Sequence, residues 1–341
     1  MTQTVQRQWH VAARPVGRPL VDGDFELAKA EVAKPAPGEV LVRTAYLGFD
    51  PAQKSWMENA ASYMNPVEIG GVMPGSGAGV VVESQHPDFA PGEAVFGHLG
   101  WQELATVPGK LLYKAPPGVP LDAVLSVLGG TGRTAYLALM KVGKPVAGDT
   151  LLISGAAGAT GSLVGQIGKI AGCRVIGIAG GPEKCAWLTG ELGFDAAIDY
   201  KNEKVRTRLR ELAPGGVDIF FDNIGGDLLN DALARLAPRA RVVICGGISR
   251  YNFDPRSEEM PAGPRNYFNV VFTGATIQGF LMPQYERDFP EADARLADWV
   301  RAGRIKPRAD VLEGFENAPA ALMRLFEGRN VGKQLLKVGA A

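Results

Sequence analysis

The clearest pattern that could do chemistry is a glycine-rich turn in the middle of the chain. An apolar run at 150–154 leads into Gly-Ala-Ala-Gly-Ala-Thr-Gly at 155–161, and a helix-like segment follows. Aligned with G-x-G-x-x-G, the turn places Ala156 in the first glycine position, Gly158 in the second and Gly161 in the third. The second glycine lets the backbone approach a pyrophosphate, and the third lets helix and strand pack closely. Because helix N-terminal amides favour phosphate oxygens, a dinucleotide is predicted to bind here, at Gly158, Ala159, Thr160 and Gly161.

The residues after the next apolar run indicate which dinucleotide binds. Sites for NAD usually place Asp or Glu at the end of the second strand, where it accepts from the ribose 2′-hydroxyl. Here the run at 174–179 continues as Gly180-Gly181, without a carboxylate. Lys184 follows in the next helix-like segment, and Tyr200 closes the third apolar run. An ammonium and a phenol can both donate to a phosphate, so the pattern favours NADPH over NADH.

The segments around this turn have the rhythm of a parallel sheet covered by helices. From residue 126 to residue 304, short apolar runs alternate with helix-length segments; the runs lie at 150–154, 174–179, 196–199, 217–221, 241–245 and 276–280. Apolar runs without polar alternation are typical of strands covered on both faces. Residues 126–304 are therefore predicted to form a doubly wound Rossmann dinucleotide-binding domain.

The two ends of the chain have a different texture. Residues 1–125 hold short β-like runs separated by Pro-Gly turns; the runs lie at 39–44, 79–83, 94–97 and 111–113. Such spacing predicts a compact antiparallel, barrel-like domain. Residues 305–341 again contain β-like runs, which predicts that this segment rejoins the first domain. The predicted fold class is α/β, with a barrel-like domain into which the Rossmann domain is inserted.

Composition excludes several classes of protein. Among 341 residues, 36 Lys and Arg balance 36 Asp and Glu, so the chain lacks the basic excess of nucleic-acid proteins. Three cysteines and three histidines, all scattered, predict neither a disulfide framework nor a zinc site. No unbroken apolar run reaches the ~18–20 residues of a membrane span, and the N-terminal segment lacks the apolar core of a secretory signal. We therefore expect a cytoplasmic protein with neither nucleic acid nor membrane as partner.

Several longer motifs lie outside the glycine turn. They read Asp-Pro at 50–51, Glu-Ile-Gly-Gly-Val-Met at 68–73, Phe-Asp-Asn-Ile-Gly-Gly at 221–226, Cys-Gly-Gly-Ile-Ser-Arg-Tyr-Asn at 245–252 and Asn-Val-Gly-Lys at 330–333. With the turn, they resemble the zinc-free medium-chain dehydrogenase/reductases, and within these the group of prostaglandin reductases, curcumin reductases and plant double-bond reductases. The resemblance spans the whole chain.

The resemblance implies a GroES-like domain built from both chain ends, a Rossmann domain between them, and NADPH as coenzyme. It implies reduction of the C=C bond of α,β-unsaturated ketones and aldehydes, and a homodimer that pairs through the edge of the Rossmann sheet. By motif, Gly158 to Gly161 would hold the pyrophosphate, and Lys184 with Tyr200 the 2′-phosphate. The rest of the coenzyme path would comprise Asn223, Cys245, Gly246, Ser249, Tyr251, Phe280, Leu281, Met282 and Asn330.

The chain also departs from the family pattern. Zinc-dependent relatives carry Gly-His-Glu where this chain reads Pro-Gly-Ser-Gly-Ala-Gly at 74–79. Conjugate reduction needs no Lewis acid, because hydride adds to the β-carbon and the carbonyl oxygen takes the charge. Several relatives have a carbonyl-contacting tyrosine where Phe272 stands here, and Phe272 cannot donate. Tyr251 and Tyr63 are therefore the candidate catalytic donors, with Tyr267 as a third, and Tyr251 is also expected to contact the coenzyme ribose.

Two other functions stay open on sequence grounds. The same scaffold could carry a quinone oxidoreductase. A nucleotide-binding protein with little turnover, acting as a redox sensor, would also keep the glycine turn.

Overall fold

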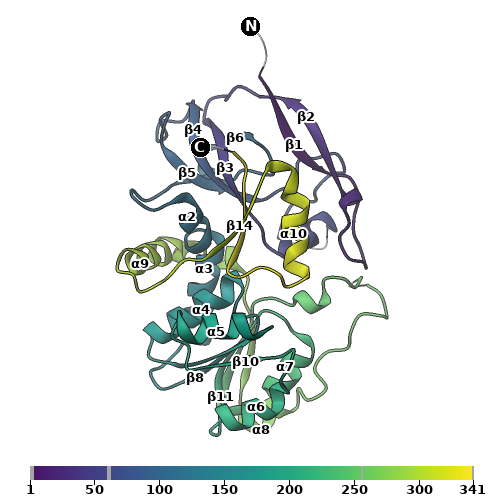
Figure 1. Ribbon diagram of the computed structural model, residues 1–341, viewed down its shortest axis with the longest axis vertical. Coiled ribbons are helices and arrows are strands. Elements are labelled where there is room, and N and C mark those ends of the chain that lie inside the picture. Colours follow the sequence, from purple (N-terminus) through teal and green to yellow (C-terminus); the bar gives the residue numbers. More distant parts are fainter. Residues whose placement is uncertain (1–3, 60–62, 255, 340–341) are drawn as a thin grey trace. The chain divides into compact units, whose positions relative to one another are not determined.

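The chain folds into two compact units in a computed structural model that describes residues 4–59, 63–254 and 256–339 (Figure 1). Unit 1 comprises residues 1–129 and 308–341, and unit 2 comprises residues 130–307. These limits lie a few residues beyond the expected boundaries. The helix α2 (Leu121–Val127) packs on the sheet of unit 1. Lys306 remains with unit 2 because its amide donates to Gln166 Oε1 at 2.7 Å.

Unit 2 is built on a six-stranded parallel sheet. The strand order is β10-β9-β8-β11-β12-β13, which is the 3-2-1-4-5-6 order of a doubly wound dinucleotide-binding fold. The predicted α/β class is thereby confirmed. The strands are β8 (Thr150–Ile153), β9 (Arg174–Ala179), β10 (Ala196–Asp199), β11 (Val217–Asp222), β12 (Leu236–Ile244) and β13 (Thr276–Gly279).

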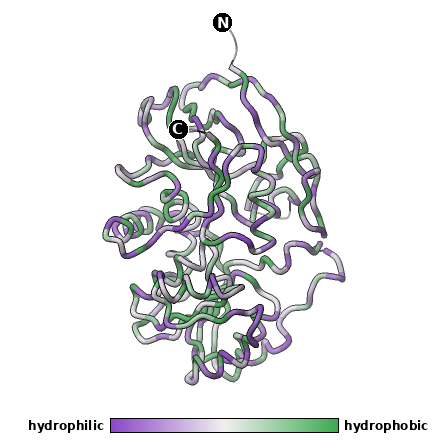
Figure 2. Tube along the Cα trace, viewed as in Figure 1, coloured by the Kyte–Doolittle hydropathy of each residue, from purple (hydrophilic) through white to green (hydrophobic). Residues whose placement is uncertain are grey.

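Helices cover both faces of this sheet and bury its inner strands. Leu152, Ile176 and Phe220 have less than 1% of their surface exposed. Hydrophobic stretches run through unit 2 in Figure 2. The helices are α3 (Gly130–Leu137), continued as the π-helix η3 (Ala138–Gly143), α4 (Ala159–Ile170), α5 (Pro182–Gly190), α6 (Val205–Leu212), α7 (Gly226–Leu233), α8 (Asn269–Thr273) and α9 (Phe289–Arg301), with 3₁₀ turns η4 (Ile248–Arg250) and η5 (Met282–Asp288).

Two glycines let α4 pack closely against the loop before β10 and against β8. A Cβ at Gly165 would lie 1.9 Å from Phe194 Cζ, and one at Gly168 would lie 2.4 Å from Leu151 Cδ2. Neither position has room for a side chain. The close approach fixes the N-terminus of α4 against the end of β8.

Unit 1 contains a seven-stranded sheet and a two-stranded one. The larger sheet has the order β14-β15-β3-β4-β5-β7, with β6 also paired to β3. Its C-terminal strand β15 pairs antiparallel with β3, so the chain end returns to the first domain. The elements are β1 (Val5–Val11), β2 (Phe25–Glu31), β3 (Glu39–Gly48), α1 (Ala52–Met57), β4 (Ser76–Ser84), β5 (Ala94–His98), β6 (Leu104–Pro108), β7 (Leu112–Lys114), β14 (Ala309–Glu313), α10 (Ala318–Phe326) and β15 (Lys333–Lys337), with 3₁₀ turns η1 (Asp22–Asp24), η2 (Gly109–Leu111) and η6 (Phe315–Asn317).

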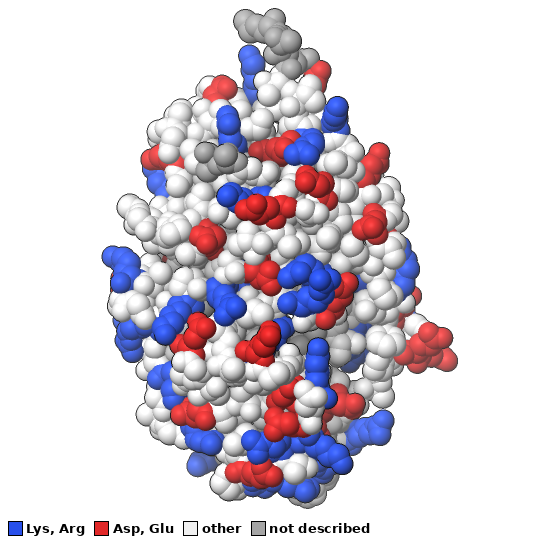
Figure 3. Space-filling view, in the orientation of Figure 1, with Lys and Arg blue, Asp and Glu red and all other residues white. Residues whose placement is uncertain are grey.

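One helical stretch, Leu121–Gly143, is long and apolar enough to cross a membrane by length and composition. This stretch is not an unbroken apolar run, because charged residues such as Arg133 and Lys141 interrupt it. In the structure 78% of its most apolar window is buried, as in the core helices of globular proteins. Acidic and basic side chains are interspersed over the face shown in Figure 3, in keeping with the balanced charge.

Candidate coenzyme site

The predicted coenzyme turn joins β8 to α4. Gly155 makes the tight turn with φ +60°, and the amide of Gly158 donates to Gly155 O at 3.0 Å. The assignment of Ala156 to the first glycine position was therefore wrong, because the left-handed residue precedes it. Gly158 is the N-cap of α4, and its carbonyl accepts from Ser162. The amides of residues 159–161 precede Ser162, whose amide is the first to donate within the helix, so they remain available to a ligand.

The backbone of this turn leaves room for a pyrophosphate only because side chains are missing. A Cβ at Gly161 would lie 2.4 Å from Gly155 O, which no real structure tolerates without a shift. A Cβ at Gly158 would lie 3.2 Å from the same oxygen, a tight but tolerable contact. Gly161 therefore serves helix–strand packing, and Gly158 leaves the cradle at the helix N-terminus open. The turn fits a dinucleotide.

The end of β9 and the residues after β10 come together, as the 2′-phosphate prediction requires. A Cβ at Gly180 would lie 2.9 Å from Tyr200 Cε1 and 3.0 Å from Lys201 Cε. Lys184, in the first turn of α5, lies three residues after Gly181. Sequence reasoning did not assign Lys201 to the site, and its signal was its place directly after Tyr200. The structure places the side chain of Lys201 beside Gly180.

The carboxylate of Asp199, at the end of β10, accepts hydrogen bonds close to Gly180. Asp199 Oδ1 accepts from the amides of Gly181 at 2.8 Å and Lys201 at 3.1 Å, and Oδ2 accepts from Asn202 Nδ2 at 2.7 Å. The Gly181 hydrogen bond is the largest cause that lowers the pKa of Asp199. Because these donors stabilise its charge, Asp199 stabilises the turn after β9. The region around Gly180 is therefore left to the cationic side chains.

The ends of β8, β11 and β12 bring further predicted residues to the same edge of the sheet. Asn223 donates through its backbone amide to Ser154 Oγ at 2.8 Å and through Nδ2 to Ser154 O at 2.7 Å. The amides of Cys245 and Gly246 donate to Asp222 O at 2.9 and 3.0 Å. This anchored edge is where ligands bind in open α/β sheets.

The loop after β12 carries the remaining predicted residues of unit 2. Ser249 Oγ donates to Ile224 O at 2.6 Å, and Tyr251 follows the turn η4. Burial raises the pKa of the Cys245 thiol to about 12. The thiol is therefore uncharged at neutral pH and acts as a packing group.

The strand β13 leads into the segment that holds Phe280, Leu281 and Met282. The amide of Phe280 donates to Ile244 O at 3.0 Å, which places it beside the end of β12. Its ring stacks on Tyr285 with centroids 4.9 Å apart. Phe272, by contrast, lies on α8 with 77% of its surface exposed.

Two predicted residues, Tyr63 and Asn330, belong to unit 1. The Tyr63 hydroxyl accepts a hydrogen bond from Trp56 Nε1 at 3.0 Å and is 42% exposed. Because indole can only donate, the hydrogen of the Tyr63 hydroxyl is left to donate elsewhere. Asn330 is buried, and its Nδ2 donates to Gly332 O at 2.9 Å. Their roles stay predictions.

A polar cluster that the sequence did not reveal lies where β3, β4, β5 and β15 meet. Strand register aligns Gly48, Ser76 and His98, and Ser76 falls in the stretch that corresponds to Gly-His-Glu of zinc-dependent relatives. Beside it, the buried Lys333 Nζ forms an ion pair with Oδ1 of the partly exposed Asp50 at 2.6 Å. Burial lowers the pKa of His98, and the charge of Asp50 partly offsets this. The cluster gives unit 1 a polar surface at the end of its sheet.

Comparison with known proteins agrees with this geometry. Two family models match, described as the N-terminal domain of oxidoreductase over residues 7–115 and as zinc-binding dehydrogenase over residues 159–298. The NADPH-dependent curcumin reductase of Escherichia coli is 39% identical, over 97% of this chain and 96% of its own length. The NADP⁺-dependent 2-alkenal reductase of Nicotiana tabacum is 36% identical over 93% of both chains.

A solved structure extends the match to three dimensions. CurA from Vibrio vulnificus in complex with NADPH is 38% identical, with a TM-score of 0.90 over 98% of this chain and 100% of that one. The chain belongs to the medium-chain dehydrogenase/reductases. Like its NADP-dependent relatives, this medium-chain reductase is an NADPH-dependent oxidoreductase.

The second family description names zinc, a metal that proteins hold with a cluster of ligating side chains. Within residues 4–59, 63–254 and 256–339, no three His, Cys, Asp or Glu side chains gather closely enough to hold a metal ion.

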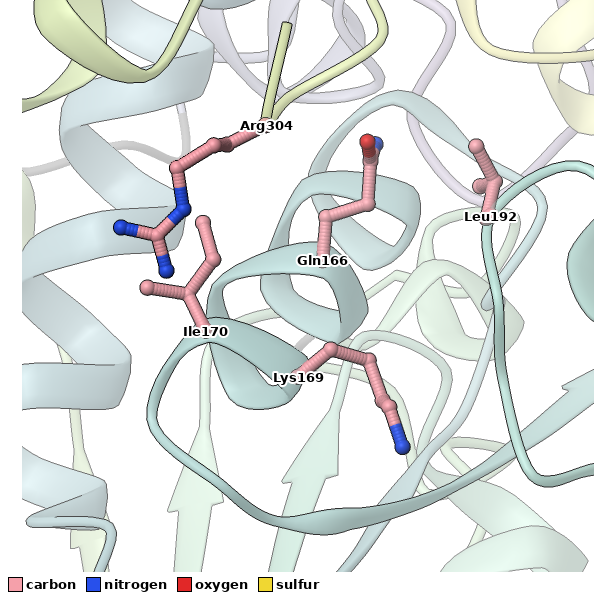
Figure 4. Close-up of a pocket in the computed structure, with 5 residues that line it drawn as sticks. All are labelled: Gln166, Lys169, Ile170, Leu192 and Arg304. Atoms are coloured by element: carbon pink, nitrogen blue, oxygen red, sulfur yellow. The ribbon is translucent and has the colours of Figure 1, made fainter. Parts of the chain in front are cut away.

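A hollow of about 230 Å³ lies at the other end of α4 (Figure 4). Its lining comes from the last turns of α4, the loop after α5 and the segment after α9, namely Gln166, Lys169, Ile170, Leu192 and Arg304. Lys169 pairs with Asp195 at 2.8 Å, and Gln166 Oε1 accepts from the amide of Lys306. We assign the coenzyme to the N-terminus of α4 because that end has free amides, whereas the hollow adjoins the helix C-terminus.

Proposed function

We propose that this medium-chain reductase reduces the C=C bond of α,β-unsaturated ketones and aldehydes. The observation that carries the proposal is the coenzyme cradle at 155–161, in a chain whose close relatives include a curcumin reductase and a 2-alkenal reductase. Bound NADPH supplies the hydride that the β-carbon of the substrate accepts. The protein must then align two planar partners and offer a hydrogen-bond donor to the carbonyl oxygen, where negative charge develops.

The proposed donors are Tyr251 and Tyr63. Tyr251 follows η4 at the coenzyme edge of unit 2. Tyr63 has its oxygen occupied as an acceptor from Trp56, which directs its own hydrogen outward. A proton delivered to the α-carbon, from a weak acid or from water, completes the saturated product.

The test combines consumption of NADPH with analysis of the product. The substrates are an enone, an enal, a quinone and an alcohol with NADP⁺, and NADH serves as the coenzyme control. NADPH deuterated at its transferable position should leave deuterium on the β-carbon of the saturated ketone. Turnover of the quinone alone would instead support a quinone oxidoreductase, and tight NADPH binding without any turnover would support a sensor.

We also propose that the protein is a homodimer that pairs through the edge of the unit 2 sheet. The support is an apolar surface, the α8 patch, formed by Tyr267, Phe268, Val271 and Phe272, with 55–77% of each residue exposed. Beside it lies β13, an exposed strand that ends the described sheet. Exposed apolar surface next to a strand edge is a common site of association.

Light scattering after size-exclusion chromatography tests the dimer. Val271→Glu places a charge in the α8 patch and should yield a monomer that keeps its fold. Val146→Glu is the matched control, because Val146 is similarly exposed, at 62%, and lies outside the patch. A monomeric wild type, or equal effects of the two variants, would contradict the proposal.

A further inference from the structure

A hydrogen-bond hub lies where β8 and β11 end, and sequence reasoning assigned it no role. Asp222 is the last residue of β11, and only 1% of its surface is exposed. Its Oδ1 accepts from Ser154 Oγ at 2.7 Å and from the amides of Ile224 and Gly225, both at 3.0 Å. Three donors therefore converge on one carboxyl oxygen.

The other carboxyl oxygen is in the opposite situation. Asp222 Oδ2 is buried and has no hydrogen-bond partner in the part of the chain that the structure describes. A carboxylate shares its charge between two oxygens, and a buried one without donors is strongly disfavoured. The neutral form costs less, because a buried hydroxyl without an acceptor is less unfavourable than a buried charge without a donor. Burial raises the pKa of Asp222, and the hydrogen bonds from Gly225, Ser154 and Ile224 offset this in part.

The hub holds the backbone on which the predicted coenzyme contacts depend. Ser154 Oγ, which donates to Asp222, also accepts from the amide of Asn223. The main-chain oxygen of Asp222 accepts from Cys245 and Gly246 at the end of β12. One side chain and its own carbonyl thus connect the ends of three neighbouring strands, β8, β11 and β12.

We propose that Asp222, together with Ser154, is a positioning residue for the coenzyme. Its neutral carboxyl holds three strand ends together, so that Asn223 and the loop after β12 form a fixed surface for NADPH. The proposal rests on coenzyme binding at this edge and is independent of which substrate is reduced.

The neutral form implies a dependence on pH. When Asp222 loses its proton, a negative charge forms at a buried oxygen without a donor, and the hub loosens. The titratable group that faces it from β12 is Cys245, whose thiol is uncharged at neutral pH. Affinity for the coenzyme should therefore fall as the pH rises through the pKa of Asp222.

The experiment measures the dissociation constant of NADP⁺, which is stable in acid, by calorimetry across a range of pH. Asp222→Ala removes the hub and should weaken binding about tenfold or more. Asp222→Asn keeps an acceptor for the three donors and replaces the hydroxyl with an N–H, so it should bind as the wild type does at low pH. The affinity of the wild type for NADP⁺, divided by that of Asp222→Asn, should fall as the pH rises. Titration of the 2′-phosphate affects both proteins equally and therefore cancels in this ratio of affinities.

Asp218→Asn is the matched control. Asp218 lies on the same strand and its Oδ2 accepts from the amide of Thr150 on β8 at 2.8 Å, at the opposite edge of the sheet. It should leave NADP⁺ affinity unchanged. If Asp222→Ala does not fold, Ser154→Ala takes its place, because it removes a donor to Asp222 and the acceptor for Asn223.

Several results would overturn the proposal. Asp222→Ala or Ser154→Ala could bind NADP⁺ with unchanged affinity, or Asp222→Asn could lose as much affinity as Asp222→Ala. The ratio of wild-type affinity to Asp222→Asn affinity could stay constant with pH. The control Asp218→Asn could lose as much affinity as Asp222→Ala. A wild type that binds NADP⁺ normally but reduces no enone would refute the proposed function and leave the role of Asp222 intact.

Discussion

Replacement of Gly161 by alanine tests the coenzyme turn most directly. The new Cβ would lie 2.4 Å from Gly155 O and 2.8 Å from the Cα of Ala156. Real Cβ atoms essentially never approach within 3.0 Å, so the start of α4 and the turn must separate by about 0.6 Å. Both neighbours are backbone atoms, which cannot rotate away as a flexible side chain can.

The expected loss of stability follows from two opposing effects. Overpacking against a rigid neighbour costs about 1–3 kcal/mol. Alanine in a helix gains at most about 1 kcal/mol over glycine. The free energy of unfolding of unit 2 should therefore fall by about 1–2 kcal/mol, and each kcal/mol lowers the Tm of a domain of this size by about 2–4 °C. Displacement of the amides at 159–161 should also weaken NADPH binding about tenfold or more.

The assays are thermal unfolding without coenzyme and titration of NADPH by its fluorescence. Gly190→Ala is the control, because Gly190 ends α5 and no atom lies within 4 Å of its Cβ position, so stability should hold or rise. Gly158→Ala should leave the fold intact, since its Cβ lies 3.2 Å from Gly155 O, and should weaken NADPH. A Gly161→Ala protein with native stability and native NADPH affinity would refute this account of the turn.

Three further substitutions test other parts of the site. Lys184→Ala should raise the KM for NADPH by the equivalent of about 1.5–3 kcal/mol and leave the KM for NADH unchanged, and an equal loss with both coenzymes would count against a 2′-phosphate contact. Tyr251→Phe should lower kcat with an enone if its hydroxyl assists the reaction, whereas native steady-state kinetics would remove it from the candidates. The lowered pKa of Asp199 stabilises the fold above its unfolded pKa near 3.8, and this contribution disappears as the pH falls through the lower folded value. Asp199→Asn should therefore lower the urea midpoint at neutral pH and converge with the wild type in strong acid; identical midpoints at neutral pH would show that the charge contributes nothing.

The inner strands of unit 2 could be predicted because each is a short apolar run that is buried on both faces. The expected runs at 174–179 and 196–199 coincide with β9 and β10. The start of β12 was predicted too late. Leu236 already pairs with Val217, and Arg239, with φ +60°, interrupts the regular strand, so a polar stretch concealed the first part.

Some residues of the site could likewise be predicted from the sequence, and others could not. The turn at 155–161 could be found because its chemistry lies within seven consecutive residues. Lys201 and Gly180 are 21 positions apart, and their contact arises because β9 and β10 are neighbours in the sheet. Even within the turn, backbone geometry decided that Gly155 rather than Ala156 makes the bend.

The sequence by itself determined the α/β class, the place of the coenzyme turn and the preference for a phosphorylated ribose, because these depend on residues close together along the chain. Only the tertiary structure decided that Ser154 and Asp222, 68 residues apart, share a hydrogen-bond hub at the ends of β8 and β11. The physical reason is that strand order depends on how the intervening helices cross the sheet, and this order alone makes the ends of β8 and β11 adjacent.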